Sequence, residues 1–208
     1  MASATKIDYK RELGELYAPG KEPAIVEVPE LNFLMIDGHG DPNSAPAYSE
    51  AIEALYTLSY TAKFALKRSP AGLDFTVMPL EGLWWTPDMA SFSTAEKSAW
   101  DWTVMIMQPE QVSEEVFEQA LQSARSKKQL AAFDRLRLES FAEGLSAQVM
   151  FIGPYAEEGP AIARLHAFIA EQGYELAGKH HEIYLSDPRR CAPEKLKTII
   201  RQPMAAAR

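Results

Sequence analysis

The sequence contains one cysteine, Cys191, which excludes an internal disulfide. Proteins of oxidising compartments commonly rely on several disulfides, so a lone thiol favours a reducing compartment. No apolar run approaches the ~18 residues that a membrane-spanning helix needs. The amino-terminal residues also lack the apolar stretch of a secretory signal. We therefore expect a cytoplasmic protein with no membrane partner.

Basic residues are also in the minority, because 21 Lys and Arg stand against 29 Asp and Glu and give a net charge of −8. Nucleic-acid binding depends on clustered Lys and Arg that neutralise phosphates. The charge balance therefore argues against a nucleic-acid partner. An acidic surface can attract cationic small molecules, but it can equally serve solubility alone.

Signatures of metal and phosphate sites are missing as well. The sequence has no HExxH or CxxC spacing, and His180 and His181 would point to opposite faces of a strand. Gly38 and Gly40 do not begin a phosphate-binding loop, because Asn43 breaks the GxGxxG pattern. No GxSxG nucleophile elbow is present either. We expect neither a metal nor another cofactor.

The chain has 208 residues, 47% of them hydrophobic, which suffices for the core of one domain built from two related halves. Residues 1–23 are charged and interrupted by proline and glycine, and we interpret them as an N-terminal arm. Residues 24–208 then form a single domain. We divide it into a first half-repeat (24–112), a connecting helix (113–134) and a second half-repeat (135–208).

Apolar periodicity predicts three helices, which are Ala47–Lys67, Ser113–Lys128 and Glu157–Gln172. Ser113 is a typical N-cap residue, and glutamates follow it where the helix dipole favours negative charge. Gly173 provides a natural stop to the last helix.

Short apolar runs bounded by turn residues predict the strands. They are Leu31–Ile36, Phe75–Leu80, Trp100–Met107 and His180–Ser186, together with a hairpin of Arg135–Phe141 and Leu145–Ile152 that turns at Glu143-Gly144. The segment Glu81–Ala99 is interpreted as a loop, and Leu196–Gln202 could be helix or strand. Each half then has the order strand, helix, strand, strand. The simplest architecture is an α+β fold, in which a mostly antiparallel sheet carries its helices on one face and leaves an open, concave ligand cleft.

The stretch Met150–Asp187 holds the strongest site candidate. Its last strand carries Glu182 and Tyr184 two residues apart, so both side chains point to one face, as does that of His180. A carboxylate and a phenol that share a strand face suit a ligand cleft. They are less natural on a surface strand without a function.

The tryptophans are a second candidate. Trp100 and Trp102 share one face of a predicted strand, whereas Trp84 and Trp85 lie in the preceding loop beside Glu81. Indole rings can hold a flat ligand by stacking and can attract a cation. Aromatic residues at strand spacing are also common in protein cores, so each of the four could be structural.

The residues from Gly153 to Pro188 resemble the GyrI-like small-molecule-binding domains of some multidrug-sensing transcription regulators. The matching residues, in order and spacing, are Gly153-Pro154-Tyr155, Gly173, Gly178, Glu182-Ile183-Tyr184-Leu185 and Asp187-Pro188. The first half, with NFLMIDGHGDPN and LEGLWWT, is similar to the stand-alone branch of the family. The chain lacks the helix-turn-helix extension of the regulators, so the resemblance does not imply a direct role in transcription.

The resemblance implies a fold of two duplicated strand–helix–strand–strand (SHS2) modules with a central cleft, where a glutamate meets cationic or planar aromatic ligands. Some stand-alone members are hydrolases that open the cyclopropane ring of DNA-alkylating cyclopropanoid antibiotics. For this chain the resemblance implies such a hydrolase, with Glu182 orienting or deprotonating the attacking water. Tyr184 and Tyr155 would stabilise the charge that builds on a ligand carbonyl as the ring opens.

The remaining residues implied at the site are a set of ligand contacts. They are Trp84, Trp85, Trp100 and Trp102 as the stacking surface, Glu81 as a second acid and His180 as a further contact. Each has a structural alternative, namely a place in the core or, for the acids, on a solvated surface.

Two other functions stay open beside hydrolysis. The chain could sequester cationic aromatic compounds without turnover, or it could neutralise another protein, as the gyrase inhibitor that gives the family its name does. A chemically changed ligand would support hydrolysis, and an unchanged ligand at saturation would support sequestration. The tryptophan-rich stand-alone form favours hydrolysis by resemblance.

Overall fold

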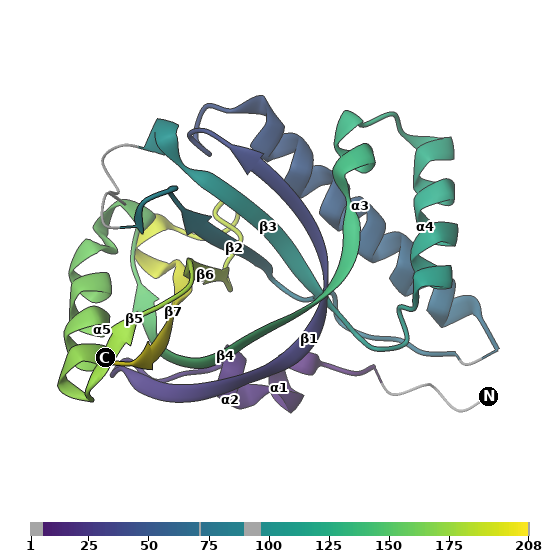
Figure 1. Ribbon diagram of the computed structural model, residues 1–208. Helices are drawn as coiled ribbons and strands as arrows, with labels where there is room; N and C mark the ends of the chain where they lie inside the picture. Colours follow the sequence, from purple (N-terminus) through teal and green to yellow (C-terminus); the bar gives the residue numbers. More distant parts are fainter. Residues whose placement is uncertain (1–5, 71, 90–96, 208) are drawn as a thin grey trace.

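Six strands form a closed antiparallel ring in the computed structural model, which describes residues 6–70, 72–89 and 97–207 (Figure 1). The ring strands are β1 (Ala24–His39), β2 (Leu80–Trp85), β3 (Asp101–Gln108), β4 (Arg137–Ile152), β6 (His180–Tyr184) and β7 (Lys197–Ala206). Their order is β4–β1–β3–β2–β6–β7, and β7 pairs with β4 to close the ring. A short strand, β5 (Tyr174–Leu176), extends the sheet beside β7.

The α+β class and the antiparallel sheet are therefore confirmed. The sheet closes on itself, however, so its second face is the interior of a ring and not an open concave surface. The physical reason is strand length, because β1 and β4 have 16 residues each and can pair with different neighbours along their course.

The three predicted helices are confirmed to within two residues at each end. They are α3 (Pro46–Arg68), α4 (Glu114–Lys127) and α5 (Gly159–Glu171). Ser113 caps α4 as expected, because its hydroxyl accepts a hydrogen bond from the backbone N–H of Val116. The shorter helical segments are α1 (Tyr9–Glu12), α2 (Gly14–Tyr17), η2 (Lys97–Ala99), η3 (Ala131–Arg135), η4 (Tyr155–Glu157) and η5 (Pro193–Lys195).

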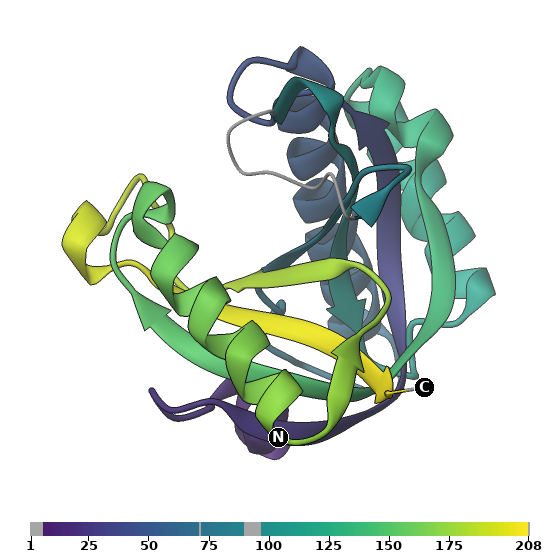
Figure 2. The same cartoon turned by 60° about the vertical axis from the view of Figure 1, so that its left-hand side comes forward.

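Helices α3 and α5 cover the outer face of the ring on its two separate halves (Figure 2). Helix α3 contacts β1 and β3, and α4 packs against α3. Helix α5 contacts β4, β5 and β7, and its Leu165 and Ile169 pack with Val149 and Ile200. In the strand order, β2 and β6 lie between the strands under α3 and those under α5. The outer face of β2 and β6 is thus where the two halves meet.

The hairpin predicted between Arg135 and Ile152 is wrong, because β4 runs unbroken through this range. Gly144, at the predicted turn, has a φ of +73°, yet it pairs with Val28 in a continuous register. Since β1 pairs with β4 on both sides of this glycine, the backbone bends there without reversing its direction.

Strand β2 lies where the sequence predicted a loop, and the predicted strand Phe75–Leu80 is wrong. Within that range Phe75 forms an isolated bridge with Ile7, and β2 begins only at Leu80. Both faces of β2 are buried, so the alternation of polar and apolar residues that marks a half-exposed strand is missing. The ambiguous segment Leu196–Gln202 is part of strand β7.

Residues 6–23, the described part of the proposed arm, take part in the core. Leu16 and Tyr17 of α2 are 5% and 4% exposed and belong to the large hydrophobic cluster that the ring and α3 share. The division at residue 23 stays a prediction. Within the described ranges, no helix has the length and apolar character needed to cross a membrane.

Candidate functional site

Glu182 projects from β6 onto the outer face of the ring, in the region between α3 and α5. In the strand register it faces Gly82, and its face is shared by Trp84 and Trp102, whose rings contact Tyr48 of α3. The side chain of Glu182 is 12% exposed. The carboxylate is therefore almost fully enclosed by the residues around it.

Two neighbours on the same strand hold the Glu182 carboxylate. Its Oε1 lies 3.1 Å from Nε2 of His180, and its Oε2 accepts a hydrogen bond of 2.6 Å from the hydroxyl of Tyr184. Burial alone would raise the pKa of Glu182, but the bonds from His180 and Tyr184 outweigh burial and hold this pKa below its ordinary value. Glu182 is thus an ionised carboxylate in a nearly dry environment.

Glu158, the residue that precedes α5, places a second carboxyl group beside Glu182. Glu158 is 4% exposed, and its Oε1 is buried without a hydrogen-bond partner among the described residues. Burial, followed by the negative charge of Glu182, raises the pKa of Glu158 to about 9. The pair therefore shares one proton at neutral pH, which Glu158 carries. A protonated acid and an ionised base in one site are suited to acid–base chemistry.

Three tyrosines border this pair of carboxyl groups. The ring of Tyr155 meets that of Tyr184 edge-on at a centroid distance of 5.5 Å, and Tyr48 interacts with the Tyr184 hydroxyl from α3. Burial raises the pKa of Tyr155 to about 12, and burial together with the Glu182 charge raises the pKa values of Tyr48 and Tyr184 further. All three phenols stay protonated and can donate hydrogen bonds.

Trp84 forms the aromatic wall next to Glu182. Its ring lies 5.8 Å from that of Tyr48 and 5.3 Å from that of Trp100, and Trp84 is 2% exposed. The Nε1 of Trp84 is buried without a hydrogen-bond partner in the described part of the chain. An unpaired buried donor costs roughly 1–3 kcal/mol, so a water molecule or a ligand atom is expected to satisfy it.

Trp102 lies beside Trp84 on the neighbouring strand β3. It is fully buried, its Nε1 donates a hydrogen bond of 3.2 Å to the carbonyl oxygen of Gly40, and its ring meets Tyr48 edge-on at 5.2 Å. No ring face of Trp102 is exposed to a ligand. Its role as a stacking surface therefore depends on movement of the residues that cover it.

Glycines of β1 and β2 let these indoles lie flat on the sheet. A Cβ atom at Gly82 would lie 2.8 Å from Nε1 of Trp84, and one at Gly38 would lie 2.1 Å from the ring of Trp102. A side chain at either position would displace the indole above it. The two glycines thus set the position of the aromatic wall.

Gly82→Ala is expected to displace the Trp84 ring and to weaken the binding of an aromatic cation by about 1 kcal/mol, the usual contribution of an aromatic contact. Tetraphenylphosphonium titrations followed by tryptophan fluorescence measure the Kd. The matched control is Gly14→Ala, because no atom lies within 4 Å of a Cβ placed at Gly14. An unchanged Kd together with an unshifted Trp84 indole N–H resonance in Gly82→Ala would contradict this role.

Two predicted site residues lie elsewhere. Trp85 follows Trp84 on β2 and points to the opposite face, where Nζ of Lys179 lies 3.3 Å from its ring centre. Glu81 is fully buried inside the ring. It accepts a hydrogen bond of 2.7 Å from the hydroxyl of Tyr17 and pairs with Nε2 of His181 at 3.1 Å. The structure therefore does not bring Trp85 and Glu81 to Glu182.

The interior of the ring holds a buried charge network around His181. Nδ1 of His181 lies 2.9 Å from Glu143, which also pairs with Arg201 at 3.1 Å. Arg201 donates further bonds to Gln148 and to the carbonyl oxygen of Leu16. Burial opposes the charge on His181, but its carboxylate partners raise the pKa of His181 to about 9. The four charged residues of this network, Glu81, Glu143, His181 and Arg201, thus each lie next to an opposite charge.

The sequence patterns did not identify Glu158 and Tyr48 as site residues. Glu158 stands before Gly159 and Pro160, a pattern typical of a helix start, and nothing in this pattern reveals a contact with a strand further along the chain. Tyr48 precedes the apolar residue Ile52 by one helical turn, so the periodicity of α3 could have placed it on the face that meets the sheet.

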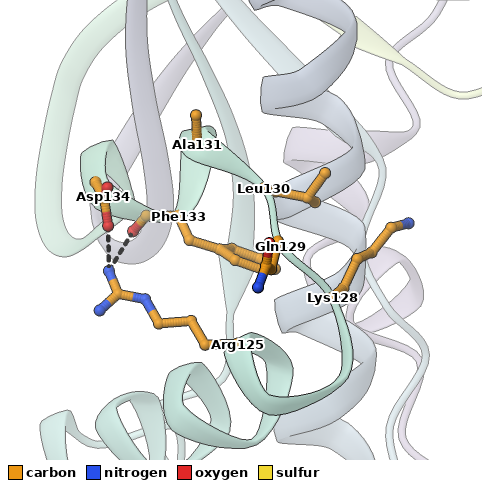
Figure 3. A pocket seen from close by; sticks show the side chains of 7 residues that line it. All are labelled: Arg125, Lys128, Gln129, Leu130, Ala131, Phe133 and Asp134. Carbon is orange, nitrogen blue, oxygen red and sulfur yellow. Dashed lines mark hydrogen bonds and ion pairs between the residues drawn. The ribbon is translucent and has the colours of Figure 1, made fainter.

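A cavity of about 360 Å³ lies between the end of α4 and η3 (Figure 3). Arg125 spans it, with Nη2 at 2.7 Å from Asp134 and 3.3 Å from the carbonyl oxygen of Phe133. None of its lining residues belongs to the Glu182 site, and its charged side chains have partners, because Arg125 pairs with Asp134 and Lys128 pairs with Glu53.

Comparisons with known proteins agree with this fold. Residues 21–204 match the family model of the GyrI-like small molecule binding domain. A hydrolase from Listeria innocua is 41% identical, with a TM-score of 0.85 over 96% of this chain and 100% of that one. Another structure of a hydrolase from this organism is 42% identical, with a TM-score of 0.87 over 97% and 100%. The C-terminal domain of EcmrR, at 14% identity and a TM-score of 0.55 over 89% and 98%, shares the fold alone. The comparison with curated proteins gave no match.

Proposed function

Because the chain belongs to the GyrI-like small-molecule-binding family, we propose that it binds strained, planar, electrophilic molecules at Glu182 and opens them by adding water. Cyclopropanoid genotoxins are the substrate class that we propose. The observation that carries this proposal is the pair of Glu182 and Glu158, one ionised and one protonated, in a nearly dry aromatic site. The relatives described as hydrolases, at 41% and 42% identity, support it.

The proposed reaction uses the two carboxyl groups in different roles. Glu182 accepts a proton from a water molecule, whose oxygen forms a bond with a cyclopropane carbon. The ring C–C bond breaks, and its electron pair moves through the conjugated system to the carbonyl oxygen. That oxygen takes the proton of Glu158, and the proton gained by Glu182 then returns to Glu158. The net change is the addition of one water.

The aromatic residues serve binding and charge stabilisation in this proposal. Tyr155 and Tyr48 stay protonated and half-buried, so each can donate a hydrogen bond to an oxygen that gains negative charge as the ring opens. Trp84 contributes a ring wall and an unpaired N–H donor. A flat molecule with a carbonyl group matches both features.

Mass spectrometry of a cyclopropanoid indole alkylator incubated with the pure protein tests the proposal. We expect conversion to a product heavier by one water, at a rate above that in buffer alone. Intact compound at saturating protein, together with quenched tryptophan fluorescence, would mean that the protein binds the compound without turnover. That outcome would support sequestration and contradict hydrolysis. Intact compound without any binding signal would remove this substrate class.

Sequestration of cationic aromatic compounds is the second candidate function, and the fixed charge of Glu182 favours it. Both carboxylate oxygens of Glu182 are held by His180 and Tyr184, so the negative charge is oriented without a ligand. A cation near this charge and the Trp84 ring would gain electrostatic and cation–π attraction. Binding of tetraphenylphosphonium with no turnover of any cyclopropanoid would select this function.

The carboxyl pair predicts a bell-shaped pH profile. Turnover requires ionised Glu182, whose pKa lies below the ordinary 4.5, and protonated Glu158, whose pKa is about 9. We expect turnover to fall when the pH drops below the ordinary pKa of a glutamate, and to fall again above about pH 9. Glu158→Gln should lower turnover and remove the alkaline fall, with the buffer rate subtracted at each pH. An alkaline fall of the same shape in Glu158→Gln would contradict the role of Glu158.

A further inference from the structure

A second cavity, of about 350 Å³, lies on the inner-face side of β2, away from Glu182. Its lining residues come from β2, β4, β7 and the turn before β6, and they are Leu83, Phe141, Ala142, Glu143, Leu145, Ala177, Gly178, Lys179, Pro203 and Met204. Most of these side chains are apolar. Leu83 pairs with His181 in the register, so the cavity and the Glu182 site lie on opposite faces of the same two strands.

Lys179 is the cation at this cavity, and no carboxylate of the described residues pairs with it. Its ammonium group lies 3.3 Å from the ring centre of Trp85, and the residue is half-buried. Across residues 6–70, 72–89 and 97–207, no carboxylate forms an ion pair with Lys179. Because the residue is half-buried, desolvation of its ammonium group lowers the pKa of Lys179.

The carboxylates around Lys179 are already engaged by other groups. Asp37 pairs with Arg137 and accepts a hydrogen bond from Thr103. Glu139 pairs with Arg137 as well, and Asp101 pairs with His39. Among the described residues, Lys179 therefore forms no ion pair of its own with these carboxylates.

Glu143, at the cavity itself, is also neutralised. Its Oε1 pairs with Nδ1 of His181 at 2.9 Å and its Oε2 with Nη1 of Arg201 at 3.1 Å. Its side chain is only 2% exposed. The carboxylate therefore presents little negative charge to a molecule in the cavity, and the unpaired charge at this place is positive.

We propose that this cavity binds a small amphipathic anion, namely a carboxylate on an apolar chain or ring. The carboxylate would accept hydrogen bonds from the Lys179 ammonium group at the edge of the cavity. The apolar part would lie against Leu83, Phe141 and Leu145. The volume of the cavity falls within the range of about 300–1,000 Å³ that small-molecule sites occupy. This site is separate from the Glu182 site and does not depend on its proposed function.

Titration of the full chain with octanoate tests this proposal, with backbone amide chemical shifts as the readout. We expect saturable shifts at Leu83, Gly178 and Lys179. The matched ligand control is octylammonium, which has the same chain and the opposite charge. The matched variants are Lys179→Met, which keeps the apolar stem, and Lys179→Arg, which keeps the charge.

Octanoate binding should weaken by about tenfold or more in Lys179→Met, as expected for the loss of a charge-assisted hydrogen bond, and should persist in Lys179→Arg. Octylammonium should bind at least about tenfold more weakly than octanoate to the unmodified chain. Equal binding of the two ligands, unchanged binding in Lys179→Met, or shifts confined to Glu182 and Tyr184 would each overturn the proposal. The comparison of ligands needs no variant, so it decides even if Lys179→Met does not fold.

Discussion

Glu182→Gln is expected to lower the turnover of a cyclopropanoid substrate by roughly 10²–10⁴-fold, the usual contribution of general acid–base catalysis. Glutamine keeps the size of the side chain and can still bond to Tyr184, but it cannot accept a proton from water. The KM for a neutral planar substrate should change little, because the aromatic wall of Trp84 and Tyr48 is left in place. Product formation followed by mass spectrometry separates kcat from KM.

The control for this variant is Glu175→Gln, which removes an equal charge from the exposed strand β5. Its turnover should match that of the unmodified chain. If Glu182→Gln retains full turnover while Glu158→Gln loses it, the base is misassigned. If both retain it, the carboxyl pair has no part in the reaction.

Arg201→Met is expected to lower the free energy of unfolding by about 3–5 kcal/mol, the cost of leaving a buried charge without its partner. Arg201 is 2% exposed, and its loss would leave Glu143, Gln148 and the carbonyl oxygen of Leu16 without their bonds to the guanidinium group. The methionine fills part of the space but supplies no donor. Urea unfolding followed by circular dichroism gives the difference.

Arg164→Met provides the matched control for this prediction. Arg164 is an arginine with an ion pair to Glu22, but both side chains are largely exposed, at 48% and 85%. Exposed pairs contribute about 0–1 kcal/mol, so this variant should unfold at nearly the same urea concentration as the unmodified chain. Equal effects of the two substitutions would mean that the interior network contributes no more than a surface ion pair.

How well the sequence predicts this fold depends on how many faces of an element are buried. Helices α3, α4 and α5 each have one polar side, so their periodicity of 3.6 residues reveals them. Strand β2 is buried on both faces and contains a glycine, so it has neither alternation nor a clear apolar run. Ring closure depends on pairing between β4 and β7, which are far apart in the chain, and no local pattern encodes it.

In the candidate site, too, the sequence predicts contacts within one strand but not contacts between elements that are far apart in the chain. The spacing of His180, Glu182 and Tyr184 places their side chains on one strand face, and the structure has them bonded to each other. The partners of Glu182 from other elements, Glu158 and Tyr48, approach through tertiary packing alone. Strand alternation could also have separated Trp84 from Trp85, once β2 was known to be a strand.

Closure of the ring also affects how the protein resists association with other chains. A sheet edge exposes unpaired N–H and C=O groups that can recruit a strand from another molecule, and each of the six ring strands pairs with at least two others over part of its length. Among the described strands, only β5 pairs with a single strand, and it has three residues with an exposed glutamate at its centre. Short length and charge are the features that keep an edge from acting as a template. Ring closure thus reduces the amount of unpaired backbone that the sheet offers to other chains.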